Sequence, residues 1–397
     1  MDFDIRKDFP LLEKYPQLIY LDSACTSLKP RQVIDAQISY YTELGACGGR
    51  SSHFLGRKTS EKIEESREKI LEFLGAKGQE LIFAKNTTEG LNIVINGLDY
   101  SKRNKIVTTV IEHHAILLPL MKLRDDGKIK LEILMCDNEG KVSLEQWKNA
   151  IDKQTALVIT NSANNTTGFN QNTKQITKIA HDNGALICVD GAQGVAHHKT
   201  EFSKDNYDFL CFSGHKMLGP NGIGGLVCKK ENLQKLKPFV LGGGTVKTVT
   251  LDKVEYLTNH EKFEAGVQNY PGIIGLTSAC EYLKKLKMEN VEKYERELAK
   301  EMLDVLEQND AIIYGSKTLE NHSALFSFGI KGARAHDVAL MLDQQNIAVR
   351  SGFFCAQPAM EAIGAKDGAV RASCYIYNTK EEIRKFSQAL TKLKALY

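Results

Sequence analysis

The sequence predicts an α/β protein with a large domain, built on a mainly parallel mixed sheet covered by helices, and a smaller α+β domain. Two observations support this fold class. Between residues 81 and 228, seven apolar runs of strand length alternate with helical patterns, which is typical of parallel strands joined by right-handed crossovers. After about residue 275 the pattern changes to longer amphipathic helices and shorter strands. We place the large domain at 17–280 and the smaller one at 1–16 and 281–397.

The first elements are short. Residues 18–24 read as a strand, and Pro30 begins a helix that extends to about Glu43. The Gly-rich stretch Gly45–Arg57 predicts an irregular loop, and Thr59–Leu74 predicts a helix that Gly75 stops. The seven strands of the large domain follow, and their β-branched content fits a sheet covered on both faces. They are Leu81–Ala84, Lys105–Val110, Lys130–Met135, Ala156–Thr160, Ala185–Val189, Phe209–Phe212 and Gly225–Cys228.

The last third of the chain carries one long apolar stripe at helical spacing, from Gly275 to Leu306, which predicts a single amphipathic helix. Short strands at Ala311–Tyr314 and Ala324–Phe328 and a helix at His336–Gln345 follow it. A terminal helix is predicted over Thr379–Leu396.

Composition excludes several classes of protein. The 397 residues are 42% hydrophobic and 25% charged, as in ordinary globular proteins, and a net charge of +3 is too small to indicate nucleic-acid binding. We expect no secretory signal and no membrane span, because no apolar run reaches about 20 residues. Nine cysteines without a CxxC pair argue against disulfides and a zinc ribbon, and favour a cytoplasmic location. The adjacent His113-His114 and His197-His198 pairs lack metal-site spacing, so we expect no metal.

Two strands end in residues that suggest a cofactor. Asp190 follows one apolar run, and Ser213-Gly214-His215-Lys216 follows the next. Ligands of open α/β sheets bind beyond the carboxyl ends of the strands. An acid and a lysine at that edge could hold the two ends of pyridoxal phosphate, which needs a lysine for its Schiff base and an acid at its ring nitrogen. Taken alone, a solvated aspartate and lysine on two loops fit this pair equally well.

Other strand ends supply matching groups. Thr87 and Thr88 open a helix after the first strand, where hydroxyls and free N–H groups form an anion site, although a plain N-cap explains them too. His113 follows the second strand and could stack on a ring, although such histidines more often decorate a surface. Asn165 lies in an amide-rich loop, and Gln193 follows Asp190. The convergence of five strand ends favours a cofactor site over the separate local explanations.

Cys355 differs from the cysteines in apolar runs, because it lies in a loop bounded by Gly352 and Pro358. Arg350 could raise the thiolate fraction there, and the thiolate is the nucleophile. Arg371 could clamp a carboxylate through its planar fork. Judged on composition alone, a loop cysteine is more often inert.

Together these residues resemble the class V aminotransferase-like group of fold-type I pyridoxal phosphate enzymes. Within this group they resemble the cysteine desulfurases, closest to the SufS type (group II). The similarity covers nearly the whole chain. Its most specific parts are Val189-Asp190-Gly191-Ala192-Gln193, Ser213-Gly214-His215-Lys216 and Arg350-Ser351-Gly352-Phe353-Phe354-Cys355-Ala356, supported by Phe263-Glu264-Ala265-Gly266 and Arg371-Ala372-Ser373.

The resemblance implies a role for each position. Lys216 would carry pyridoxal 5'-phosphate as a Schiff base and act as the acid–base group, while Asp190 would hold the ring nitrogen. Cys355 would attack the sulfur of L-cysteine, leaving a persulfide and releasing alanine. The other contacts would be His113 stacked on the ring, Gln193 at its 3-oxygen, Thr87, Thr88, Ser213 and His215 at the phosphate, and Asn165, Arg350 and Arg371 in the substrate site, Asn165 also contacting the cofactor.

Two positions depart from the family pattern. Phe353-Phe354 stands where a His-His pair is common, which removes a proton donor, and desolvation by the rings would raise the pKa of the thiol. Val267 and Tyr270 stand where the family usually has threonines, one of which commonly reaches the phosphate of the partner subunit. That cross-subunit contact is therefore in doubt.

The resemblance also implies partners. A homodimer is expected, together with a sulfur-acceptor protein of the SufE or SufU kind, or a scaffold, because the short cysteine loop restricts delivery. The sulfur would serve iron–sulfur clusters or other thio-cofactors. Selenocysteine lyase and cysteine sulfinate desulfinase remain open as alternatives, as do another class V reaction and a sulfur-trafficking scaffold that binds the cofactor without turnover.

Overall fold

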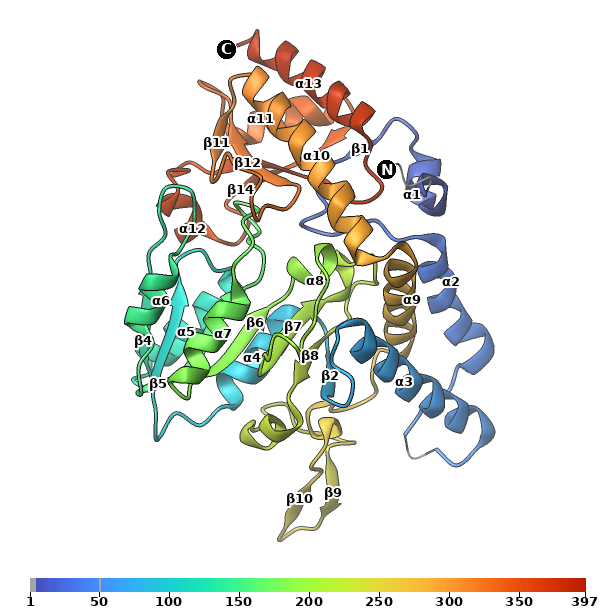
Figure 1. Ribbon diagram of the computed structural model, residues 1–397. Helices are drawn as coiled ribbons and strands as arrows, with labels where there is room; N and C mark the ends of the chain where they lie inside the picture. Colours follow the sequence, from blue (N-terminus) through green and yellow to red (C-terminus); the bar gives the residue numbers. More distant parts are fainter. Residues whose placement is uncertain (1–4, 50) are drawn as a thin grey trace.

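A computed structural model describes residues 5–49 and 51–397 (Figure 1). Its centre is a seven-stranded sheet in the order β2-β8-β7-β6-β5-β3-β4. The predicted residues 1–4 of the smaller domain, and Arg50 of the predicted loop, lie outside the described residues. The strands are β2 (Glu80–Ala84), β3 (Lys105–Thr109), β4 (Lys130–Leu134), β5 (Thr155–Asn161), β6 (Leu186–Asp190), β7 (Phe209–Ser213) and β8 (Gly224–Cys228).

The predicted fold class and all seven strands are confirmed, each strand within one or two residues. Strands β7, β6, β5, β3 and β4 run parallel, whereas β8 is antiparallel to both β7 and β2. Parallel pairing is therefore wrong for β8. The connection between β7 and β8 explains this direction, since it consists only of residues 214–223. A parallel crossover needs a dozen or more residues, whereas an antiparallel return does not.

Side chains alternate between the two faces of the sheet, as the period of a strand requires. Val189 and Leu210 join the core on one face, and Cys188 and Cys211 join the core on the other. Helices cover both faces, so most residues of the strands are buried, except in the edge strand β4. On the first face lie α3 (Phe54–Phe73), α6 (Leu144–Ala150), α7 (Thr173–Asp182) and α9 (Tyr270–Leu286), and on the second α4 (Thr87–Gly97) and α5 (His114–Asp125).

The smaller domain contains a four-stranded antiparallel sheet in the order β11-β12-β15-β14, at the top of Figure 1. Its strands are β11 (Ile312–Tyr314), β12 (Leu325–Gly329), β14 (Arg350–Gly352) and β15 (Ala369–Ser373), and α10 (Met288–Gln308), α11 (Ala335–Asp343) and α13 (Lys380–Lys394) pack with it. The short strand β1 (Ile19–Tyr20) pairs with β13 (Ile347–Ala348), which brings the N-terminal segment beside this domain. The exact domain boundaries stay a prediction.

Several predicted bounds are wrong. The single helix over 275–306 is two helices, α9 and α10, because Lys287 between them has a positive φ of 67°. The predicted strand over 18–24 is reduced to β1, and α3 begins at Phe54, inside the predicted loop. By contrast, the helix predicted from Pro30 to about Glu43 is confirmed, as α2 (Arg31–Ser39) continued by a π-helical turn over Tyr40–Leu44.

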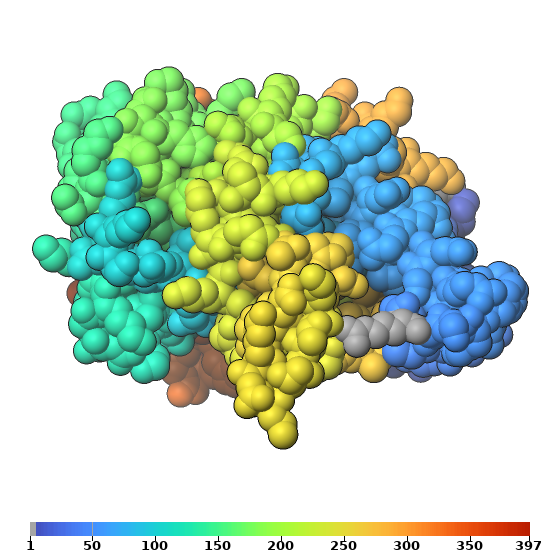
Figure 2. Space-filling view, turned by 90° about the horizontal axis from the view of Figure 1, so that it is seen from below, coloured from blue at the N-terminus to red at the C-terminus, as the bar shows by residue number. Residues whose placement is uncertain are grey.

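Further elements were not predicted. They include α1 (Pro10–Lys14), α8 (Gly194–His197), α12 (Gln357–Ala362) and a hairpin of β9 (Val246–Val249) and β10 (Val254–Tyr256). The hairpin projects from the end of the large domain opposite the smaller domain (Figures 1 and 2). In the described part of the chain, no helix combines the length and the apolar character needed to cross a membrane.

Candidate active site

The twelve predicted site residues line one cavity of about 220 Å³. The cavity lies at the carboxyl ends of the parallel strands, where the loops of the large domain meet β14 and β15 of the smaller domain. Its predicted lining residues are Thr87, Thr88, His113, Asn165, Asp190, Gln193, Ser213, His215, Lys216, Arg350, Cys355 and Arg371.

A buried acid and a buried lysine face this cavity. Asp190 is the last residue of β6, and Lys216 ends a short 3₁₀ turn after β7. Burial raises the pKa of Asp190 and lowers the pKa of Lys216, while the attraction between the two opposes both shifts. The backbone N–H of Ala192 donates to Asp190 Oδ1 over 2.8 Å. A bound group that carried a positive charge to Asp190 would relieve the cost of burying this carboxylate.

The N-terminus of α4 forms an anion site at the same cavity. Asn86 caps the helix by accepting from the Glu89 N–H, and Thr87 is the first helical residue. Ser213 Oγ accepts from the Thr87 N–H over 2.9 Å and lies 2.7 Å from Thr87 Oγ1. Burial and the neighbouring Lys216 lower the pKa of His215 to about 4, so its ring is neutral at pH 7. The helix dipole at this end and the hydroxyls of Thr87 and Ser213 favour a phosphate.

His113 is fixed at the N-terminus of α5, where its Nδ1 accepts from the Ala115 N–H over 3.0 Å. Burial, followed by the nearby Lys216, lowers its pKa to about 4. A neutral ring that accepts at Nδ1 carries its proton on Nε2.

The residue before this histidine anchors its loop. Glu112 is completely buried and accepts from the hydroxyls of Thr109 and Thr160 and from the side-chain amide of Asn161, so it joins the ends of β3 and β5. Burial raises the pKa of Glu112 to about 7.

The loop after β5 is held against the smaller domain. Asn165 Nδ2 donates to the Phe354 carbonyl over 2.9 Å, and Arg371 Nη1 donates to the Asn165 carbonyl over 2.9 Å. Gly168 has a φ of +74°, and a Cβ there would lie 2.5 Å from the Leu325 carbonyl, so only glycine allows this approach to β12. The loop therefore carries Asn165 to the edge of the cavity.

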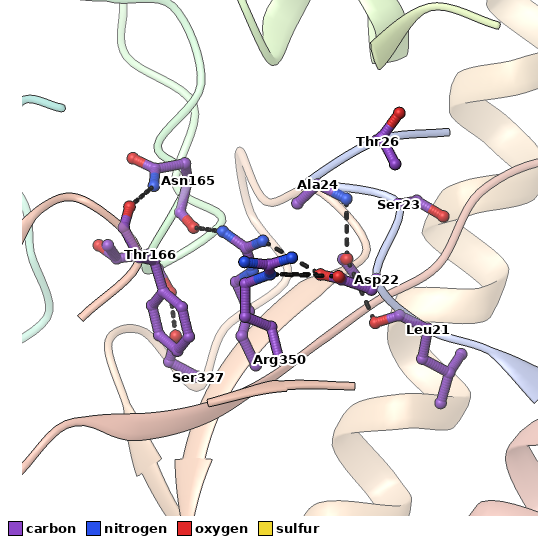
Figure 3. Close-up of polar contacts among 12 residues, drawn as sticks. Leu21, Asp22, Ser23, Ala24, Thr26, Asn165, Thr166, Ser327 and Arg350 are labelled. Atoms are coloured by element: carbon purple, nitrogen blue, oxygen red, sulfur yellow. Dashed lines mark hydrogen bonds and ion pairs between the residues drawn. The ribbon is translucent and has the colours of Figure 1, made fainter. Parts of the chain in front are cut away.

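Asp22 forms ion pairs with two arginines, a role that was not predicted from the sequence. Its carboxylate lies 3.1 Å from Arg350 Nε and 3.4 Å from Arg371 Nη2. Figure 3 shows the carboxylate of Asp22 facing the guanidinium of Arg350, with Asn165 on the opposite side. Arg371 is 3% exposed, and its Nε has no hydrogen-bond partner.

Cys355 lies at the open side of the cavity, and its side chain is exposed. Phe354 and Cys355 both have positive φ values, 53° and 56°, which is a strained pairing for residues other than glycine. The His114 N–H donates to the Cys355 carbonyl over 2.7 Å and ties the loop to the start of α5. The Phe354 ring is buried beneath the Arg371 guanidinium, 4.8 Å from its centre, whereas the neighbouring thiol is open to solvent.

Comparison with known proteins identifies the family. A model of class V aminotransferases matches residues 19–386. A probable cysteine desulfurase from Pyrococcus abyssi is 38% identical over 393 residues, covering 98% of this chain and 97% of the relative. A cysteine desulfurase from Escherichia coli O7:K1 is 35% identical over 401 residues, covering 99% and 98%. The chain belongs to the cysteine desulfurases of the class V aminotransferase family.

Solved structures of the family match the same fold. The apo structure of a cysteine desulfurase from Thermococcus onnurineus NA1 superimposes with a TM-score of 0.95 at 37% identity and covers 100% of both chains. The S-sulfonic acid form of the cysteine desulfurase CsdA from Escherichia coli gives a TM-score of 0.90 at 29% identity, covering 99% of this chain and 98% of that one.

The other departures from the family pattern lie outside the cavity. Val267 is 74% exposed, and Tyr270 begins α9 with its hydroxyl 3.8 Å from Cys47 Sγ. A contact from the partner subunit near these positions stays a prediction.

Sequence reasoning missed several residues that line or support the cavity, three of which carry polar or reactive groups. Cys25 and Asn161 line it, and Asp22 orders its arginines. An apolar strand that ends in an aspartate is the signal that could have found Asp22, since the same pattern marked Asp190.

Proposed function

We propose that this protein is a pyridoxal phosphate-dependent cysteine desulfurase. It converts L-cysteine to L-alanine and leaves the sulfur as a persulfide on Cys355. One observation carries the proposal: a buried acid–lysine pair and an exposed cysteine thiol line the same small cavity. A class V enzyme that catalyses transamination alone has no need for this thiol.

The residues of the cavity fit pyridoxal phosphate. Asp190 is a buried carboxylate that a protonated ring nitrogen would neutralise, and the N-terminus of α4 with Ser213 and His215 suits its phosphate. Lys216 supplies the amine, and the neutral ring of His113 suits stacking. The cofactor, when bound, withdraws electrons from the bonds at the substrate α-carbon.

The substrate side is built from the arginines. Arg371 and Asn165 both line the cavity, and their side chains suit an α-carboxylate. The Cys355 thiolate then attacks the substrate sulfur, so that the S–S bond of a persulfide forms as the C–S bond of the substrate breaks. Lys216 moves protons at the α- and β-carbons, and the three-carbon product leaves as alanine.

The test is turnover by purified protein loaded with pyridoxal phosphate. We expect L-cysteine to yield alanine in equal amount to transferred sulfur, and Cys355→Ser and Lys216→Ala each to lower the rate at least 100-fold. Cys47→Ser is the control, since Cys47 lies outside the cavity. Full activity of Cys355→Ser with cysteine would refute the persulfide step. Rates on selenocysteine and cysteine sulfinate test the alternative substrates.

The proposal extends to partners. Cys355 is held on a short loop by the His114 N–H, so a SufS-type reaction in which a sulfur-acceptor protein comes to the thiol fits better than a loop that carries sulfur away. The sulfur would then serve iron–sulfur clusters or other thio-cofactors. Exposed apolar side chains on the β9–β10 hairpin, Val249, Leu251 and Val254, support a homodimer.

A further inference from the structure

Cys25 is a second thiol in the cavity that contains Cys355. The nine cysteines all lie in described residues, and five are buried. Cys47 is exposed but lies outside this cavity, as does the half-buried Cys136. Cys25 and Cys355 both line the cavity, together with Lys216. Cys25 and Cys355 are therefore the two cysteines that line this one small cavity.

The position of Cys25 is fixed by the same aspartate that orders the arginines. The Cys25 N–H donates to the Asp22 carbonyl over 3.0 Å in the turn after β1. The Asp22 carboxylate in turn binds Arg350 and Arg371 (Figure 3). The turn thus holds the thiol beside the guanidinium groups at the substrate end of the cavity.

Four cations surround this thiol. Cys25 interacts electrostatically with Lys29, Lys216, Arg350 and Arg371. Lys29 is itself anchored, because its Nζ donates to Thr26 Oγ1 over 2.9 Å and to the His215 carbonyl over 3.1 Å.

We infer that Cys25 is a second sulfur-carrying residue, which takes the terminal sulfur of the persulfide from Cys355. This inference rests on the proposed desulfurase function. The Cys25 thiolate attacks the terminal sulfur, a new S–S bond forms at Cys25, and the S–S bond at Cys355 breaks. Its electron pair leaves with Cys355 Sγ, which takes up the proton that Cys25 released. Cys25 is oxidised to the persulfide level as Cys355 is reduced to the thiol, so no external oxidant is required.

This transfer changes how much sulfur one chain can hold. Once Cys355 is a thiol again, it can attack a second cysteine before any acceptor arrives. Each chain then stores one sulfur on the half-buried Cys25 and presents another on the exposed Cys355. An enzyme with Cys355 alone stops after one turnover when neither acceptor nor reductant is present.

The experiment counts turnovers without an acceptor. Protein loaded with pyridoxal phosphate is mixed rapidly with L-cysteine, with no other thiol present, and is quenched in the initial burst before free cysteine discharges the persulfides; alanine is then measured per bound cofactor. The sample is then alkylated under denaturing conditions, and the persulfides are located by peptide mass spectrometry. We expect about two alanines per chain and persulfides at both positions, against about one alanine for Cys25→Ser. Cys47→Ser is the matched control and should behave as the unaltered chain does.

Three results would overturn the inference. These are a burst of one alanine with all sulfur on Cys355, an equal burst from Cys25→Ser, or a Cys25–Cys355 disulfide with release of sulfide. The persulfides on the unaltered chain are located without any substitution. Cys25→Ala replaces Cys25→Ser as the variant if Cys25→Ser folds poorly. Failure of the proposed function gives a different result, because the unaltered chain then forms no alanine at all.

Discussion

At the scale of single residues, Asp22 is the charge that makes the buried Arg371 tolerable. Burial lowers the pKa of Arg371, and Asp22 opposes that shift. Removing one partner of a buried ion pair leaves an uncompensated charge and costs about 3 kcal/mol. We therefore expect Asp22→Asn to lower the thermal unfolding midpoint by several degrees. Glu13→Gln, which breaks the exposed pair with Arg31, is the control and should cost less than about 1 kcal/mol. Equal midpoints for the two variants would contradict this role.

The neutral histidines of the cavity predict a pH dependence of stability. The pKa of His113 is about 4 in the folded chain, below the ordinary histidine value of 6.5, so the unfolded chain takes up more protons between these values. The contribution of His113 is complete above pH 6.5 and is lost as the pH falls towards 4, by up to about 1.4 kcal/mol per pH unit. We expect His113→Gln to flatten the decline of the unfolding midpoint between pH 7 and 5. An unchanged slope would show that the folded histidine takes up its proton normally.

At the scale of elements, the junction of α9 and α10 depends on one backbone conformation. Lys287 has φ 67° and ψ 121°, a region that side chains disfavour and glycine accepts. Lys287→Gly should therefore raise the free energy of unfolding by about 1 kcal/mol, and Lys287→Val should lower it. Lys293→Gly, in the interior of α10, is the matched control and should destabilise, because glycine disfavours helix. Thermal unfolding of the three variants measures the order of their stabilities. A loss of stability in Lys287→Gly would mean that the backbone conformation of Lys287 between α9 and α10 is not strained.

At the scale of the whole molecule, the β9–β10 hairpin exposes apolar side chains that the proposed homodimer would bury. Val249 is 63% exposed and Leu251 is fully exposed on this projection (Figure 2). We expect Val249→Asp combined with Leu251→Asp to shift the native mass from two chains to one, measured by light scattering. Leu396→Asp, at an exposed apolar position near the C-terminus, is the control and should leave the dimer intact. A single-chain mass for the unaltered protein would contradict the proposed homodimer.

The sequence by itself determined the seven strands of the large sheet and the polar residues that follow them. Each strand can be recognised as an apolar run because its residues are buried. The run stops at Asp190 or Ser213 because polar residues of the site begin there. That is why all twelve predicted residues meet in one cavity. Their chemical roles stay proposals.

Only the tertiary structure decided what lies between distant segments. Asp22 reaches Arg350 and Arg371 from positions more than three hundred residues away, and Cys25 enters the cavity through the same turn. The break at Lys287 also depends on packing rather than on pattern, since apolar spacing continues across it. Local periodicity reports which side chains are buried, whereas contacts between segments depend on how the buried faces assemble.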